Sequence, residues 1–148
     1  MLVNKTVIKK LTAFVGLFIF LLMISCGKKE VKPVSQESKL AQEAFQLAET
    51  LKNAYVKNDR GTLEESSTND GYRELIGAMK KFDKAELTFT STWVEIKDSS
   101  VYLSVSWKGA WTVGTKSREE RGLAIFVFEG TPLKLARVQR DNPFRQPE

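Results

Sequence analysis

The hydrophobic period of the chain changes near residue 83 from about 3.6 to 2 and does not change back. Residues 101–113, VYLSVSWKGAWTV, show the second period most clearly, because apolar and polar side chains alternate along the segment. Such alternation is typical of a sheet with one face in the core and the other in water. Helices followed by an antiparallel sheet make an α+β domain.

A long amphipathic helix is predicted to begin after Ser35 and to end near Asn58, before Gly61. Ser35 can cap this helix, because a serine hydroxyl at that position accepts a hydrogen bond from a backbone N–H of the first turn. The apolar stripe of the helix, at steps of three and four, contains Leu40, Ala44, Leu47, Leu51 and Ala54.

Two shorter helices are predicted between the long helix and the sheet. Thr62-Leu63-Glu64-Glu65 has the S/T-x-x-E form of a capping box, which predicts a helix that starts there. Asn69 or Asp70 can cap a third helix over residues 72–82. We therefore expect one long and two short helices ahead of the sheet.

Four strands are predicted, over residues 85–96, 101–113, 118–129 and 133–140, with turn-rich sequence between them. In the first strand, Leu87, Phe89 and Trp93 share one parity. Gly109 falls between Trp107 and Trp111 on the apolar face of the second strand, where it would allow a bend or bulge. The charged start of the third strand, REER, is expected to protect an exposed strand end.

The chain begins with a basic segment and an apolar segment that stops at the only cysteine. Residues 1–10 carry three lysines and no acid, and residues 11–25 are uncharged and mostly apolar, as in a secretory signal. Leu22-Met23-Ile24-Ser25 before Cys26, with Gly27 after it, resembles the lipobox of bacterial lipoproteins. The resemblance implies cleavage before Cys26, a diacylglycerol on its sulfur and an acylated amino group. The alternative is an uncleaved anchor helix, although a membrane span needs about 20 apolar residues.

We therefore expect a signal peptide over residues 1–25, a lipidated tether over 26–35, a domain over 36–144 and a tail over 145–148. Loss of the signal peptide removes three of the 23 basic residues and none of the 18 acidic ones, so the net charge falls from +5 to +2. A nearly neutral domain gives no reason to expect nucleic-acid binding.

The chain lacks the residues that several kinds of catalysis and metal binding need. Lipidation of Cys26 leaves no thiol for a disulfide, a metal or redox work, and the chain has no histidine. Imidazole catalysis and most zinc sites are thereby excluded. No phosphate-binding glycine motif is present either. We expect no cofactor, no metal and no catalytic residue of these classes.

The order of elements, together with a last strand followed by Asp141-Asn142-Pro143-Phe144, resembles the NTF2-like cone fold of the cystatin-like superfamily, which includes SnoaL-like and ketosteroid-isomerase-like proteins. The resemblance implies helices packed on a curved four-stranded antiparallel sheet that encloses a conical pocket. Members of that family range from isomerases and dehydratases to binding modules. Their His–Asp, Asp–oxyanion-hole and Asp–Arg–Asp sets find no matching positions in this sequence, so no catalytic residue is assigned.

Aromatic residues are the candidates for ligand binding. An apolar pocket with few polar groups is what small-molecule sites usually offer. The candidates are Tyr55, Trp93, Trp107, Trp111 and Phe126. The alternative is that these side chains fill the space between the sheet and the long helix.

Charged side chains give weaker candidates. Asp59, Asp70 and Asp83 lie at predicted helix ends, where capping explains them, and Glu95 is the remaining candidate for a general base. A basic run near the C-terminus, which would meet anionic headgroups or simply form a solvated strand face, contains Lys134, Arg137, Arg140 and Arg145.

These observations favour a non-enzymatic, lipid-anchored protein on the periplasmic face of the bacterial cell envelope, binding a small apolar ligand or a protein partner through an NTF2-like cone. In lipoproteins of enteric bacteria, an aspartate after the cysteine is similar to an inner-membrane retention signal. This chain has Gly27 at that position, which favours the outer membrane in a host that has one. One alternative is an Asp/Glu-dependent isomerase, dehydratase or hydrolase of the same fold. Another is a homodimeric assembly subunit of an envelope complex.

Overall fold

The computed structural model describes residues 35–147. Cys26, the predicted signal peptide and the predicted tether up to residue 34 lie outside the described residues. Within residues 35–147, no helix is long and apolar enough to cross a membrane.

Three helices come first: α2 (Gln36–Val56), α3 (Arg60–Glu65) and α4 (Asn69–Ala78). Ser35 caps α2 as predicted, because its side-chain oxygen accepts a hydrogen bond from the backbone N–H of Ser38 at 3.1 Å. The predicted apolar stripe turns inward, and the buried residues of α2 are Ala44, Ala48, Leu51, Ala54 and Tyr55.

The two short helices begin earlier than predicted, at Arg60 and Asn69, and the expected capping role of Asp59 is confirmed. Asp59 caps α3, because its carboxylate accepts hydrogen bonds from the N–H of Thr62 at 3.1 Å and from its hydroxyl at 2.7 Å. Thr68 caps α4 by accepting a hydrogen bond from the N–H of Gly71 at 3.1 Å. Asn69 and Asp70 therefore lie in the first turn of α4. The sequence offers several capping side chains in a row, and periodicity does not choose among them.

Four strands follow: β1 (Lys84–Lys97), β2 (Ser100–Val113), β3 (Lys116–Glu129) and β4 (Lys134–Arg140). They form one antiparallel sheet in the order β1-β2-β3-β4. β4 pairs only with residues 124–129 of β3, so the charged first half of β3 has no neighbour on that side. A short 3-10 helix, η1 (Pro143–Arg145), ends the described chain.

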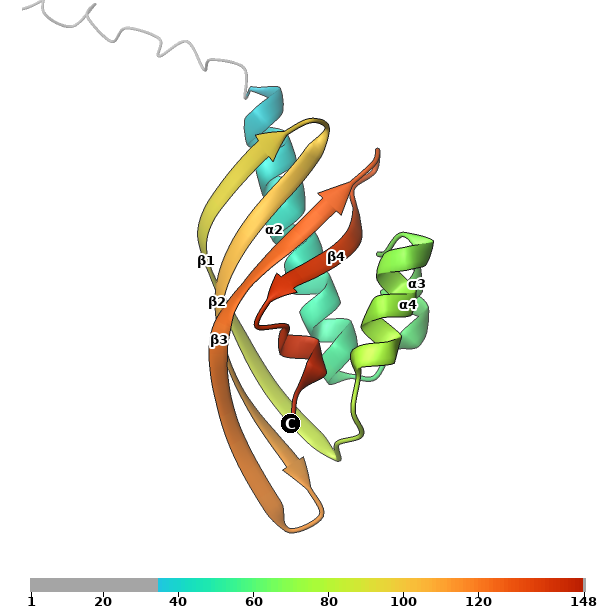
Figure 1. The fold of residues 1–148 in the computed structure, drawn as a ribbon, viewed down its shortest axis with the longest axis vertical. Helices are drawn as coiled ribbons and strands as arrows, with labels where there is room; N and C mark the ends of the chain where they lie inside the picture. The colour runs from blue at the N-terminus through green and yellow to red at the C-terminus, as the bar shows by residue number, and fades with distance from the viewer. Residues whose placement is uncertain (1–34, 148) are drawn as a thin grey trace, which may run out of the picture. The chain divides into compact units, whose positions relative to one another are not determined.

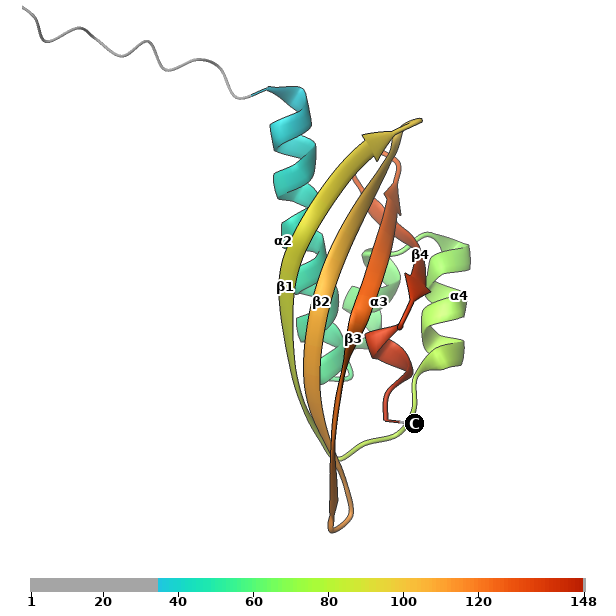
Figure 2. The same ribbon diagram turned by 60° about the vertical axis from the view of Figure 1, so that its left-hand side comes forward.

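The helices all lie on one side of a curved sheet (Figure 1). We call that side the inner face; in β2 it carries Val101, Leu103, Val105, Trp107 and Trp111, which are all buried. The opposite side, the outer face, carries Tyr102, Ser104, Ser106, Lys108, Ala110 and Thr112. Seen from a second direction, no helix of the described chain covers the outer face (Figure 2).

Helix α4 is fixed to the sheet through β4. The N–H of Thr68 donates a hydrogen bond to the carbonyl of Leu135 at 2.9 Å. Gly71 packs so closely against that carbonyl that an added Cβ would lie 2.1 Å from the oxygen, and only glycine permits this approach. The expected α+β architecture, with helices packed on a curved four-stranded antiparallel sheet, is confirmed.

Candidate functional site

The space between the inner face and α2 holds a cluster of aromatic side chains. We call Tyr55, Phe89, Trp107, Trp111, Phe126 and Phe144 the aromatic cluster. Tyr55 comes from α2, the two tryptophans from β2 and Phe126 from β3, and all four are essentially inaccessible to solvent. The two indole rings meet edge to face, with 6.3 Å between their centres. Four of the five predicted ligand-binding residues therefore lie together.

The polar atoms of this cluster are bound to other parts of the protein. The Nε1–H of Trp111 donates a hydrogen bond to the Tyr55 hydroxyl oxygen at 2.9 Å, and that hydroxyl donates to the carbonyl of Gln146 at 2.7 Å. The Nε1–H of Trp107 donates to the carbonyl of Asp141 at 2.7 Å. Burial raises the pKa of Tyr55 to about 12, although the bond from Trp111 opposes that rise.

Residues 141–147, which we call the C-terminal segment, reach into the interior of the cone with Asn142, Pro143 and Phe144, which are buried. Phe144 is fully buried, with 5.1 Å between its ring centre and that of Tyr55 and 5.8 Å to that of Phe126. Asn142, itself buried, fixes the segment by accepting a hydrogen bond from the N–H of Phe144 at 2.9 Å. Figure 2 shows this red end of the chain between β3 and α4, two elements that η1 contacts. The segment fills space that an open cone would leave for a ligand.

Two glycines allow the tryptophan rings to lie against the sheet backbone. A Cβ on Gly109 would lie 2.1 Å from the Trp111 ring, and a Cβ on Gly122 would lie 2.7 Å from the Trp107 ring. Strand pairing runs through Gly109 without a register shift, so the bulge considered at this position is absent, and the glycine makes room for the Trp111 ring.

Two hollows flank the C-terminal segment. One, of about 500 Å³, is lined by Trp107, Gly122 and Asp141 among others. The second, of about 240 Å³, is lined by Trp111, Pro147 and three residues near the β2–β3 turn. Each hollow reaches one tryptophan ring beside one end of the segment.

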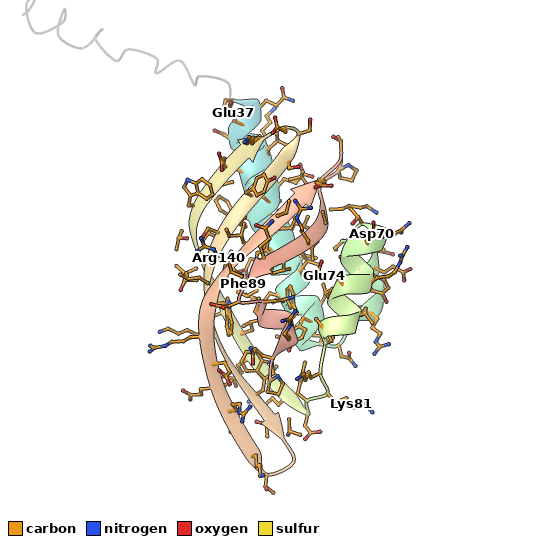
Figure 3. All side chains as sticks on the ribbon, viewed as in Figure 1. Glu37, Asp70, Glu74, Lys81, Phe89 and Arg140 are labelled. Atoms are coloured by element: carbon orange, nitrogen blue, oxygen red, sulfur yellow. The ribbon has the colours of Figure 1, made fainter. Side chains whose placement is uncertain are left out.

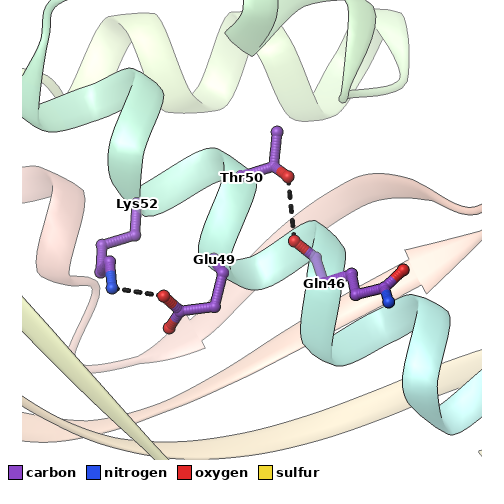
Figure 4. Close-up of polar contacts among 4 residues, drawn as sticks. All are labelled: Gln46, Glu49, Thr50 and Lys52. Carbon is purple, nitrogen blue, oxygen red and sulfur yellow. Dashed lines mark hydrogen bonds and ion pairs between the residues drawn. The ribbon is translucent and has the colours of Figure 1, made fainter.

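Lys52 of α2 covers the edge of the aromatic cluster. Its ammonium lies 5.9 Å from the centre of the Phe89 ring and forms an ion pair with Glu49 (Figure 4). On the same helix, the hydroxyl of Thr50 donates to the carbonyl of Gln46 at 2.9 Å. Lys52 therefore brings a positive charge to the edge of the cluster, whereas Glu49, Thr50 and Gln46 bond within α2.

Trp93 does not lie with the other aromatic residues, so its predicted side of the sheet is wrong. The register of β1 shifts between Ser91 and Trp93: Phe89 pairs with Trp107 on the inner face, whereas Trp93 pairs with Ser104 on the outer face. One extra residue in a strand reverses the side of every later side chain. Trp93 is consequently 51% exposed.

The acids considered as general bases lie outside the cluster. Asp59, Asp70, Asp83 and Glu95 are all exposed, and Figure 3 shows Asp70 on α4, at the far side of the domain from the outer face. Hydrogen bonds from the hydroxyl and N–H of Thr62 lower the pKa of Asp59. Asp83 accepts a hydrogen bond from the N–H of Gly114 at 2.6 Å and so fixes the β2–β3 turn rather than a helix end.

Within residues 35–147, the buried polar side chains are Ser67 and Asn142, and no group of three potential metal ligands occurs. The basic run stays at the surface of the described chain, because Arg137, Arg140 and Arg145 are exposed and Lys134 is half-buried.

No protein-family model and no curated protein sequence matches the chain. The solved structures that resemble its fold include the following two. One is an NTF2-like superfamily protein from Salmonella enterica serovar Typhimurium LT2, 10% identical, with a TM-score of 0.56 over 75% of this chain and 99% of that one. The other is a conserved protein from Planctomyces limnophilus, 16% identical, with a TM-score of 0.55 over 66% of this chain and 91% of that one. At these identities the likeness concerns the fold alone, and that fold is NTF2-like.

Proposed function

We propose that the protein is a lipid-anchored, non-enzymatic binding module of the bacterial cell envelope that binds a protein partner through the outer face of its sheet. One observation carries the proposal. The C-terminal segment fills the cone, with Phe144 fully buried, while the outer face is uncovered and exposes Trp93.

The outer face has the composition of a partner-binding surface. Trp93 and Leu123, exposed by 51% and 46%, belong to neighbouring rows of the outer face that also carry Ser104, Ser106 and Ile125. These rows are uncharged, and charged residues precede and follow them along the strands. An uncharged centre with a polar rim, anchored by an aromatic residue, is common at protein interfaces.

The aromatic cluster is poorly suited to acid–base catalysis. A catalytic carboxyl group needs a pKa near the working pH, which usually requires burial. The candidate acids are exposed, and the pKa of Asp59 moves downward instead. The polar groups of the cluster are two indole N–H groups and one phenol, each already hydrogen-bonded within the protein.

Anchoring rests on Cys26 and its flanking residues. Two acyl chains hold a protein on a bilayer where one is marginal. A tether of about ten residues reaches at most about 35 Å, so the domain would work close to the membrane. We place it on the periplasmic face, at the outer membrane where the host has one.

The anchoring proposal is tested by labelling cells with a radioactive fatty acid. Full-length wild-type chain should take up label and be processed, whereas Cys26→Ala should remain an unlabelled precursor. The control is Ser25→Thr, which changes the residue before the cleavage site but keeps Cys26, and which should therefore still take up label. Label that persists in Cys26→Ala would overturn the anchoring proposal.

The partner surface is tested by placing a photoreactive amino acid at Trp93 of the full-length chain in cells. Covalent adducts with a protein are expected there and not at Glu74, which is exposed on α4. Adducts that form only from the Glu74 position would contradict the proposal that the outer face binds the partner.

A second candidate function is the binding of a small apolar ligand inside the cone, favoured by the two hollows that reach Trp107 and Trp111. Such a ligand would have to displace Phe144. In the full-length Phe144→Ala variant, acetophenone should then shift the indole N–H resonances of Trp107 and Trp111 but not that of Trp93. Unshifted resonances would exclude this candidate.

A further inference from the structure

The first half of β3 forms an open edge of the sheet. β3 is 14 residues long, but β4 pairs only with residues 124–129, and the chain leaves the sheet at Arg140, whose φ is +65°. Figure 2 shows β2 and β3 continuing as a hairpin beyond the end of β4. Residues 117–123, which we call the open edge, therefore have β2 on one side and no strand of the described chain on the other.

The backbone of Leu123 shows which groups face the open side. Its N–H donates a hydrogen bond to the Asp141 carboxylate at 3.3 Å, and its carbonyl accepts one from the N–H of Asp141 at 3.1 Å. Every second residue of a strand points its backbone groups the same way, so those of Arg121, Glu119 and Ser117 also point away from β2. In the described part of the chain, these three N–H and three carbonyl groups have no strand partner.

An extended peptide that joins such an edge gains backbone hydrogen bonds, and its alternate side chains supply specificity. Hollows at both ends of the open edge leave room for these side chains. The larger, of about 500 Å³, is lined by Arg121, Leu123 and Asp141 among others. The smaller, of about 240 Å³, is lined by Lys116 and Arg118 among others. The open edge thus offers both hydrogen-bond partners and space.

The charges of the open edge specify which sequence can pair with it. The charged residues are Arg118, Glu119, Glu120 and Arg121. Arg118 and Glu120 share the inner face, where 3.9 Å separates their nearest charged atoms, and an exposed pair at that distance contributes little. Opposite charges across neighbouring strands stabilise a sheet. A strand that reads acid, base, base, acid from the residue opposite Arg121 would meet each charge with its complement.

A second copy of the chain does not meet this requirement. Opposite residues of an antiparallel pair lie on the same face of the sheet, so a two-fold axis through the charged residues 118–121 passes through one of them. That residue would then face its own copy, and like charges directly opposite each other are destabilising. The charge pattern therefore disfavours pairing of two copies along this edge and favours a segment of a different protein.

We propose that the open edge binds an extended segment of another protein, which runs antiparallel to β3 and places acid, base, base and acid opposite residues 121, 120, 119 and 118. This segment continues the sheet where β4 ends. The inference goes beyond the outer-face partner and does not depend on it, because the groups that bind are backbone atoms at a strand edge. The residue opposite Lys116 lies over the smaller hollow, which Val113, 48% exposed, also lines, so an apolar side chain fits there.

The synthetic peptide TEKKETV tests the proposal, with its first threonine opposite Gly122 and its valine opposite Lys116. The full-length ¹⁵N-labelled chain is kept in detergent, and binding is followed by nuclear magnetic resonance. The peptide should shift the amide signals of Ser117, Glu119 and Arg121 and slow their exchange with water, with no effect at Glu74 on α4. The charge-reversed peptide TKEEKTV should bind at least about tenfold more weakly. Equal binding of the two peptides, or no binding of either, would overturn the proposal, because the charges would then only shield the edge.

Methylation of single backbone nitrogens in TEKKETV tests the strand pairing itself. The second lysine, opposite Glu119, points its N–H at the open edge, whereas the first lysine, opposite Glu120, points its N–H away. Methylation of the second lysine nitrogen should weaken binding at least about tenfold, and methylation of the first should change it little. Equal losses from the two modifications would contradict pairing along this edge.

Exchange of two exposed charges in β3 tests the register. The double variant Glu119→Arg, Arg121→Glu requires a base opposite position 121 and an acid opposite position 119, so it should prefer TKKEETV over TEKKETV. The wild-type chain should show the reverse preference. Lys81→Glu, a charge reversal at an exposed position after α4, should keep the wild-type preference. A double variant that still prefers TEKKETV would overturn the proposed pairing.

Discussion

Trp111 donates a hydrogen bond to Tyr55, with 2.9 Å between Nε1 and the hydroxyl oxygen. The same hydroxyl donates a hydrogen bond to the carbonyl of Gln146 at 2.7 Å. Three parts of the chain, β2, α2 and the C-terminal segment, are joined by this one phenol. The cone is therefore closed by hydrogen bonds as well as by packing.

Replacement of Tyr55 by phenylalanine should lower the free energy of unfolding by about 1–3 kcal/mol, because the buried N–H of Trp111 loses its acceptor. Urea denaturation of the full-length chain measures this change. Tyr102→Phe is the matched control, since Tyr102 is half-buried on the outer face. Equal losses in the two variants would contradict a special role for the Tyr55 hydroxyl.

The raised pKa of Tyr55 predicts a loss of stability in alkali. The unfolded chain releases this proton near pH 10, whereas the folded chain holds it until about pH 12. Between these values the unfolded state binds fewer protons, so the free energy of unfolding falls as pH rises, by up to about 3 kcal/mol. Below pH 10 the full contribution is present. Denaturation of wild type and Tyr55→Phe across this range should show the steeper fall in wild type, and parallel curves would count against burial of the phenol.

Gly122→Ala should cost about 1–3 kcal/mol of stability, because the new Cβ would lie 2.7 Å from both the Trp107 ring and the Asp141 side chain. Gly77→Ala is the control, since nothing lies within 4 Å of a Cβ at that site in α4. There, alanine should raise stability by up to about 1 kcal/mol through its better helix propensity. A harmless Gly122→Ala would show that the Trp107 ring does not rest on this backbone.

Phe144→Ala should lower the free energy of unfolding by about 3–5 kcal/mol, because it leaves a cavity among the rings of Tyr55, Phe89 and Phe126. Phe45→Ala on α2 should cost far less, since Phe45 is 37% exposed. Thermal denaturation of the two variants gives the comparison. A small effect at Phe144 would mean that the C-terminal segment is not part of the core.

Periodicity predicted the long helix, the four strands and the inward side of Trp107 and Trp111, because these features depend on neighbouring residues. It failed at Trp93, where a single register shift in β1 reversed the side of the later residues. A bulge adds one residue without changing composition, so alternation alone does not reveal it.

The contacts that close the cone could not be predicted from the sequence either. Asp141-Asn142-Pro143-Phe144 resembled the end of an NTF2-like domain, but the bond from Tyr55 to Gln146 spans 91 residues. The neighbouring rows of the outer face that carry Trp93 and Leu123 depend on the register between β1, β2 and β3. Local patterns carry little information on such distant pairs, whereas fully buried aromatic residues are easier to anticipate.

Hydrogen–deuterium exchange of the three indole N–H groups tests most directly whether the cone is closed and the outer face is open. The nuclear magnetic resonance signals of the full-length ¹⁵N-labelled chain report each group separately. Trp93 should exchange at once, while Trp107 and Trp111 should exchange slowly, because their protons are bound to Asp141 and Tyr55. Equally fast exchange of all three would contradict the account, since it would show an interior open to water.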